Sequence, residues 1–200
     1  PIADSSHEPV VDASPTAKAI DLVDAIERGD FAAAQNLVDN GADVNATQID
    51  GENFLLKLVK AKDCPLDQVR FLLEHGAHVR DVDSESRQIL HLAALHDRGD
   101  VVEEVAASAD SSSRNRDAES VNSLLHDMLD AKDKDGKTPI ELAQNSRCMY
   151  ALGNLVSLGA DTLALGSDGL NCLHRAIKQD YHEEIPLLLD STKNLERKTA

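Results

Sequence analysis

The chain has 200 residues, of which 42% are apolar but only 2% are aromatic, and it contains no tryptophan. Its 36 acidic and 20 basic residues give a net charge of −16, which excludes a nucleic-acid phosphate binder, because such a protein needs clustered lysine and arginine. No apolar run approaches the ~18 residues of a membrane span, so direct membrane insertion is not expected. The three cysteines share no CxxC spacing, which argues against a disulfide framework or a zinc site and favours a cytoplasmic location.

The first 16 residues are polar, contain proline and lack periodicity, which indicates a flexible linker. From residue 17 onward, short helical patterns come in pairs, such as 19–26 and 31–38, with apolar residues at three- and four-residue steps. A glycine-alanine segment recurs after the second pattern of a pair, and Gly41 and Gly76 lie 35 positions apart. This period predicts a repeat array. It is too long for leucine-rich repeats and too short for WD40 or HEAT units.

Three segments carry a second recurring motif. Asp133-Lys-Asp-Gly-Lys-Thr-Pro-Ile140 is followed by Leu142-Ala143, and Ser167-Asp-Gly-Leu-Asn-Cys-Leu-His174 and Ile89-Leu-His-Leu-Ala-Ala94 are variants of the same pattern. On these residues, together with Gly-Ala-Asp-Val-Asn at 41–45, the chain resembles the ankyrin-repeat family over residues 17–200. The resemblance implies an all-α solenoid of stacked helix–turn–helix units with short β-hairpin arms.

The repeats are expected at 17–48, 49–82, 83–132, 133–164 and 165–193, with the start of a further repeat at 194–200. We therefore expect the chain to be a piece of a longer polypeptide. The third repeat is oversized, and its extra residues are expected near 108–120, where the sequence is polar and lacks periodicity. Two alternatives stay open: either 101–107 or 121–129 is the second helix of this repeat, and the insert either binds a partner or is disordered.

Several residues have expected structural roles. The glycines at Gly41, Gly76 and Gly159 follow second helices and should adopt the left-handed conformation of a C-cap. Thr138 and Pro139 place a capping hydroxyl and a first-turn proline at the start of a helix.

Two polar pairs of residues are also expected to be structural. Asp100 and Asp180 each precede a glutamate by three positions, a capping-box spacing that should start second helices. The ankyrin resemblance implies that His91 and His174 bond to hairpin backbone between adjacent units.

The resemblance also implies a protein–protein interaction module, acting as a scaffold or adaptor within a larger intracellular protein and holding its partner on a concave face. The net charge favours a partner with a basic surface or peptide. Hairpin tips and the ends of first helices supply the candidate partner-binding residues, which are Ile49, Lys60, Val82, Asp83, Leu95, His96, Lys134, Lys178, Gln179 and Tyr181.

Other functions have weaker support in the sequence. The competing hypothesis is a regulatory or targeting arm of a larger enzyme, channel or membrane-trafficking protein. No nucleophile stands at a recognisable spacing from a histidine, so no catalytic residue and no cofactor are expected. His75 and His78 flank a helix-ending Gly-Ala but have no third ligand at a fixed spacing, so no metal site is expected.

Overall fold

The computed structural model describes residues 15–46, 48–49, 52–61, 63–111 and 118–190. The chain divides into two compact units, Pro1–Thr47 and Gln48–Ala200, and each is described by itself. Most of the linker expected at 1–16, and the further repeat expected to start at 194–200, lie outside the described residues.

The first unit is a pair of helices, α1 (Pro15–Glu27) and α2 (Phe31–Asp39), which pack against each other. Asp30 starts α2, because its Oδ1 accepts a hydrogen bond from the Ala33 N–H at 3.0 Å. Leu22, Ile26 and other aliphatic side chains of the pair are buried, as expected for an amphipathic helix pair.

The second unit holds the other described elements. One short hairpin joins β1 (Gln48–Ile49) to β2 (Glu52–Asn53) as an antiparallel pair, with Gln48 opposite Asn53. The helices, in chain order, are α3 (Phe54–Lys60), α4 (Leu66–Glu74), α5 (Ile89–Leu95), α6 (Gly99–Ser111), α7 (Ala118–Leu129), α8 (Pro139–Asn145), α9 (Met149–Ser157) and α10 (Cys172–Lys178). Residues 185–190 are also helical.

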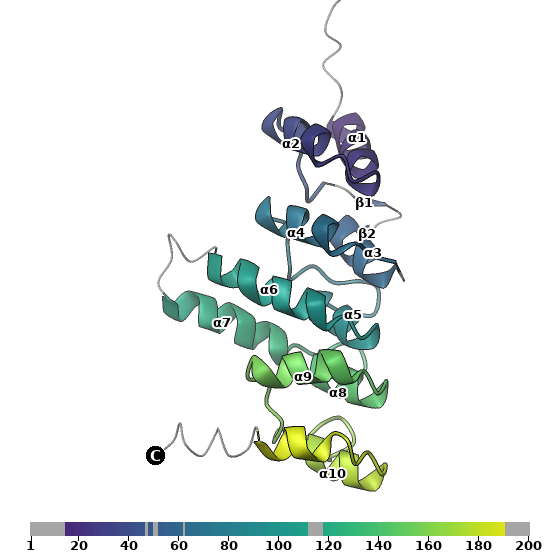
Figure 1. Ribbon diagram of the computed structural model, residues 1–200, viewed down its shortest axis with the longest axis vertical. Helices are drawn as coiled ribbons and strands as arrows, with labels where there is room; N and C mark the ends of the chain where they lie inside the picture. Colours follow the sequence, from purple (N-terminus) through teal and green to yellow (C-terminus); the bar gives the residue numbers. More distant parts are fainter. Residues whose placement is uncertain (1–14, 47, 50–51, 62, 112–117, 191–200) are drawn as a thin grey trace, which may run out of the picture. The chain divides into compact units, whose positions relative to one another are not determined.

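The helices of the second unit form two layers. The first helix of each pair packs on its counterpart, in the order α3, α5, α8 and α10, and the second helices α4, α6 and α9 pack in a parallel row (Figure 1). Most buried side chains at the layer contacts are aliphatic, including Leu56, Leu90 and Leu152. Stacking therefore buries an apolar face that no single pair could bury alone, and the all-α solenoid expected from the sequence is confirmed.

The oversized third pair contains an additional helix. Helix α6 packs on α4, α5 and α9, so it occupies the second-helix row, whereas α7 packs against α6. Of the insert expected near 108–120, residues 108–111 are helical in α6 and residues 118–120 are helical in α7, while residues 112–117 lie outside the described part of the chain.

The prediction that Asp100 and Asp180 start second helices was wrong. Helix α6 begins at Gly99, so Asp100 lies in its first turn, where its carboxylate accepts from Arg98 at 2.8 Å. Asp180 adopts a positive φ of 62°, and helical structure starts again only at residue 185. Pro186 is consequently in the first turn of that helix, where proline is tolerated.

Three hairpin loops share one backbone pattern that fixes their register. The N–H of Asp83 donates to Arg87 O, that of Asp133 to Lys137 O and that of Gly166 to Leu170 O, at 2.9–3.1 Å. Asp83, Asp133 and Gly166 are thus equivalent positions. Three residues further on, Ser86, Gly136 and Gly169 take left-handed φ values of 60°, 78° and 73°. The expected C-cap glycines are confirmed by φ values of 85°, 83° and 95° at Gly41, Gly76 and Gly159.

Candidate functional site

Six of the expected binding residues lie at or just after the C-terminal ends of three first helices of the second unit, α3, α5 and α10. Lys60 ends α3, Leu95 and His96 end α5, and the remaining three follow one another at the end of α10. We call this set the helix-end surface: Lys60, Leu95, His96, Lys178, Gln179 and Tyr181. Its charged and amide side chains are mostly exposed, whereas Leu95 and Tyr181 are half-buried.

Tyr181 is held in place by a cation. The Arg147 guanidinium carbon lies 4.7 Å from the centroid of the Tyr181 ring, within the range of a cation–π interaction. Arg147 follows α8 and adopts a left-handed φ of 58°. The contact therefore ties the end of α10 to the turn after α8, and it leaves Tyr181 partly accessible to a partner.

Asp83 departs from the expectation that it is a partner-binding residue, because only 5% of its surface is exposed. Its Oδ2 is 3.0 Å from Lys60 Nζ and 2.8 Å from Arg87 Nη2, and its Oδ1 accepts the Glu85 and Arg87 N–H groups. Burial alone would raise the pKa of Asp83, but these hydrogen bonds outweigh it and hold the pKa well below its usual range. Asp83 is therefore a structural anchor for Lys60 rather than a free carboxylate.

His96 lies in a locally positive environment. Its pKa is lowered, first by partial burial and then by the charges of Arg87, Lys60 and Arg98. The imidazole is exposed and lies at the end of α5. It is therefore neutral at pH 7 and available as a hydrogen-bonding group.

The hairpin residues proposed for binding differ in accessibility. Val82 is 53% exposed, and Lys134 is exposed with its Nζ 3.7 Å from Glu85 Oε2 of the preceding hairpin. Ile49 lies in β1, but its side chain is outside the described part of the chain.

His91 has the structural role implied by the resemblance. Its Nδ1 accepts the Gln88 N–H at 3.2 Å, so the proton is on Nε2, which lies 3.1 Å from Ala131 O and 3.2 Å from Lys137 O of the next hairpin. His174 is exposed, and the segment that would follow it in a further repeat falls at 191–200, outside the described residues. Thr138 is the N-cap of α8 and Pro139 its first residue, as expected.

A polar network at α8 and α10 was not expected from the sequence. Arg175 is only 2% exposed. Its Nη2 is 3.1 Å from Glu141 Oε1 and 2.8 Å from Asp168 Oδ1, and its Nη1 donates to Gln144 Oε1 at 3.0 Å. Gln144 in turn donates to Glu184 Oε2 at 2.7 Å, while the arginine brings the pKa of Asp168 down to about 2. The hairpin register places Glu141 where His91 stands and Arg175 where Leu92 stands.

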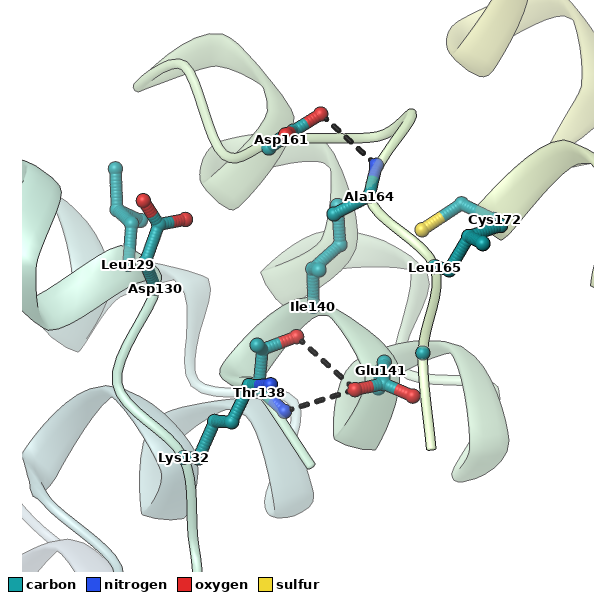
Figure 2. Close-up of a pocket in the computed structure, with 11 residues that line it drawn as sticks. Leu129, Asp130, Lys132, Thr138, Ile140, Glu141, Asp161, Ala164, Leu165 and Cys172 are labelled. Carbon is teal, nitrogen blue, oxygen red and sulfur yellow. Dashed lines mark hydrogen bonds between the residues drawn. The ribbon is translucent and has the colours of Figure 1, made fainter. Parts of the chain in front are cut away.

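The structure also contains a pocket that the sequence did not indicate. Its volume is about 220 Å³, and it lies between residues 129–132, the start of α8 and the loop 161–166 (Figure 2). Apolar and polar side chains both line it. The apolar ones include Leu129, Ile140, Leu165 and Cys172, and the polar ones are Asp130, Lys132, Thr138, Glu141 and Asp161. A signal for it exists in the repeat register, because Leu163 and Leu165 occupy positions that hold Asp130 and Lys132 in the preceding loop.

Other kinds of site lack a structural basis in the described part of the chain. Within those residues, no group of three or more His, Cys, Asp or Glu side chains is arranged to hold a metal ion. The described helices are also all too short or too polar to cross a membrane. Cys64, Cys148 and Cys172 are buried free thiols, and burial raises the pKa of Cys172 to about 11.

The two helix layers and the repeated hairpin backbone of the second unit define a helical repeat protein of stacked helix–turn–helix units. Comparison with family models matches residues 22–115 to ankyrin repeats, in three copies. This part of the chain is similar to the ankyrin-repeat family. No curated protein sequence matches it. Beyond the matched residues, the hairpins at Asp133 and Gly166 keep the same bonding. Ankyrin repeats are generally protein–protein interaction modules without catalytic activity of their own.

Proposed function

We propose that this chain binds another protein on the helix-end surface and serves as a scaffold or adaptor segment of a larger intracellular protein. The observation that carries the proposal is the composition of this surface. Half-buried Leu95 and Tyr181 lie among exposed polar side chains, the arrangement of apolar anchors within a polar rim that protein interfaces use.

The rigidity of the scaffold supports the proposal. Lys60 is fixed by Asp83, and Tyr181 by Arg147, so little side-chain freedom remains to be lost when a partner binds at these positions. His96, Lys178 and Gln179 are exposed and adaptable. The fixed residues provide affinity and the exposed ones provide hydrogen bonds to the partner.

The preferred partner is a protein with basic segments, since the chain carries a net charge of −16. The helix-end surface itself contains Lys60 and Lys178. The basic segments of the partner should therefore contact the hairpin loops, where Glu85, Asp135 and Asp168 are exposed.

The test compares partner capture from cell lysate by three folded proteins. They are the parent chain, a helix-end variant with Leu95→Glu, His96→Glu and Lys178→Glu, and a control with Glu103→Lys on the exposed side of α6. We expect the helix-end variant to lose its partners while the control keeps them, and binding to weaken at higher salt. Equal capture by parent and helix-end variant would show that another surface binds the partner.

A further inference from the structure

The loop between α9 and α10 exposes two leucines that the fold does not require. Leu163 is 50% exposed and Leu165 is 68% exposed. The shared backbone pattern aligns them with Asp130 and Lys132 in the loop before α8, and with Arg80 and Val82 in the loop before α5. Because three of these four equivalent positions hold charged side chains and the fourth holds an exposed Val82, packing within the repeat does not require leucine here.

These leucines adjoin the pocket between the two hairpins. Leu165 is part of its lining, together with the buried Leu129 and Ile140, and Figure 2 shows Ile140 between the Asp130 and Leu165 sides of the pocket. The volume of about 220 Å³ is sufficient for a side chain but not for a drug-sized ligand.

Two carboxylates lie at the rim of the pocket. Asp130 and Asp161 are both exposed, and the Asp161 Oδ1 accepts the N–H groups of Leu163 and Ala164 at 2.8 and 3.0 Å, which shapes the loop. Lys132 also lines the pocket, on the same segment of chain as Asp130 and below Ile140 in Figure 2. An occupant with an apolar side chain and an adjacent cation on the aspartate side would match both the lining and the rim.

We propose that this pocket binds an apolar side chain of a partner protein whose flanking residues are basic. The inference rests on the proposed protein-binding function, and it adds a second contact region with a defined ligand chemistry. The apolar side chain displaces water from the pocket and covers Leu165, while the cation pairs with Asp130 and Asp161. This is the usual division between a buried anchor and a charged rim.

The experiment uses capped heptapeptides as probes. One carries a central leucine with two lysines on each side, the second has glutamates in place of the lysines, and the third has glycine in place of the leucine. Methyl spectra of the full chain are recorded during titration. The lysine–leucine peptide should shift the methyl signals of Leu129, Ile140, Leu163 and Leu165 with a Kd on the order of 0.1–1 mM. The glutamate and glycine peptides should bind at least about tenfold more weakly.

Matched variants test the position of the site. Leu163→Asp with Leu165→Lys converts the loop to the residues found in the preceding repeat, so the chain should fold, yet binding should be lost. Val82→Lys, at the equivalent position two hairpins away, should leave binding unchanged. Asp130→Asn should weaken binding about threefold, the loss of one exposed charge pair.

Several outcomes would overturn the proposal. They are equal binding of the glutamate or glycine peptide, unchanged binding by the double variant, and the absence of methyl shifts at millimolar peptide. The helix-end variant separates the two functions, because it should lose lysate partners but still bind the lysine–leucine peptide. A chain that captures partners through the helix-end surface but never binds the peptide would refute the pocket and leave the proposed function standing.

Discussion

Ser86 adopts a backbone conformation that serine disfavours. Its φ is 60°, where the equivalent hairpin positions hold Gly136 and Gly169. A left-handed conformation costs a residue with a Cβ about 1–2 kcal/mol. Glycine avoids this cost, but it destabilises the folded state by about 0.5–1 kcal/mol because it loses more conformational entropy on folding. Ser86→Gly should therefore raise the free energy of unfolding by about 0.5–1 kcal/mol in urea denaturation.

Asp97 provides the matched control, since its φ is also positive at 53°. Unlike Ser86, it has a structural side-chain contact: its Oδ1 accepts the Ala151 N–H at 3.0 Å. Asp97→Gly gains backbone freedom but loses that hydrogen bond, so it should be neutral or destabilising. Equal stabilisation by both substitutions would show that the side-chain bond contributes nothing.

His91 should make stability depend on pH. Burial lowers its pKa more than the carbonyls of Lys137 and Ala131 raise it, and a proton added at Nδ1 would face the Gln88 N–H. The unfolded chain, with a histidine pKa of about 6.5, therefore binds more protons below pH 7 than the folded chain. The contribution of neutral His91 to the free energy of unfolding is therefore complete above about pH 6.5. It is lost as the pH falls towards the lowered pKa, and the free energy of unfolding then changes by at most about 1.4 kcal/mol per pH unit.

The measurement is urea denaturation between pH 7 and pH 5. His91→Gln should abolish the slope due to His91, because glutamine does not titrate, while its amide N–H keeps a donor near the Ala131 and Lys137 carbonyls. His174→Gln is the control, since His174 is exposed, and it should keep the parent slope. Because the pKa of His96 is also lowered, part of the parent slope should remain in His91→Gln, and an undiminished slope would contradict the assignment to His91.

At the scale of elements, the contact between α8 and α10 uses two charged residues at positions that hold other residue types earlier in the stack. Glu141 and Arg175 stand where the preceding junction, between α5 and α8, has His91 and Leu142. Arg175→Leu leaves Glu141 buried without its cation, so it should cost about 3–5 kcal/mol. Adding Glu141→His places an imidazole near Ala164 O and Leu170 O, the equivalents of the two carbonyls that His91 contacts. The double variant should recover about 1–3 kcal/mol of coupling in a double-mutant cycle.

One result of the double-mutant cycle would contradict this interpretation. If Glu141→His and Arg175→Leu give additive losses, the two residues act independently, and the network is not a substitute for the histidine–leucine arrangement. Thermal denaturation of the parent, the two single variants and the double variant under identical salt conditions decides between these results.

Sequence reasoning worked where the rules are local. Paired helical periodicity and left-handed glycines follow from short motifs and their spacing, and the His91 contact was implied by the ankyrin resemblance. It did not work where the outcome depends on two repeats meeting. Asp83 is buried because Lys60 and Arg87 converge on it, and the pocket exists because two hairpins lie beside each other. Neither contact is visible in the sequence of one repeat.

At the scale of the whole second unit, stability should vary along the stack. Helices α5 and α6 have neighbouring pairs on both sides, whereas α10 packs mainly against α8 among the described elements. Because each unit of a solenoid is stabilised by its neighbours, opening free energies should be highest near α5 and α6 and lower at α10. Hydrogen exchange followed by mass spectrometry should show slower exchange at 89–105 than at 172–178. Uniform protection would indicate that the stack unfolds as one cooperative unit.

The buried arginine also restricts how this array can be lengthened or rearranged. Gly166 has no room for a Cβ, since one would collide with Glu141 Oε1 and Arg175 Nη2. A copy of residues 165–190 placed directly after the α5–α6 pair would set Arg175 against His91, which offers no carboxylate. The α10 unit therefore requires a preceding unit that carries a carboxylate at the position of Glu141. A protein engineer who extends the stack should insert new units before α8 and leave the α8–α10 junction intact.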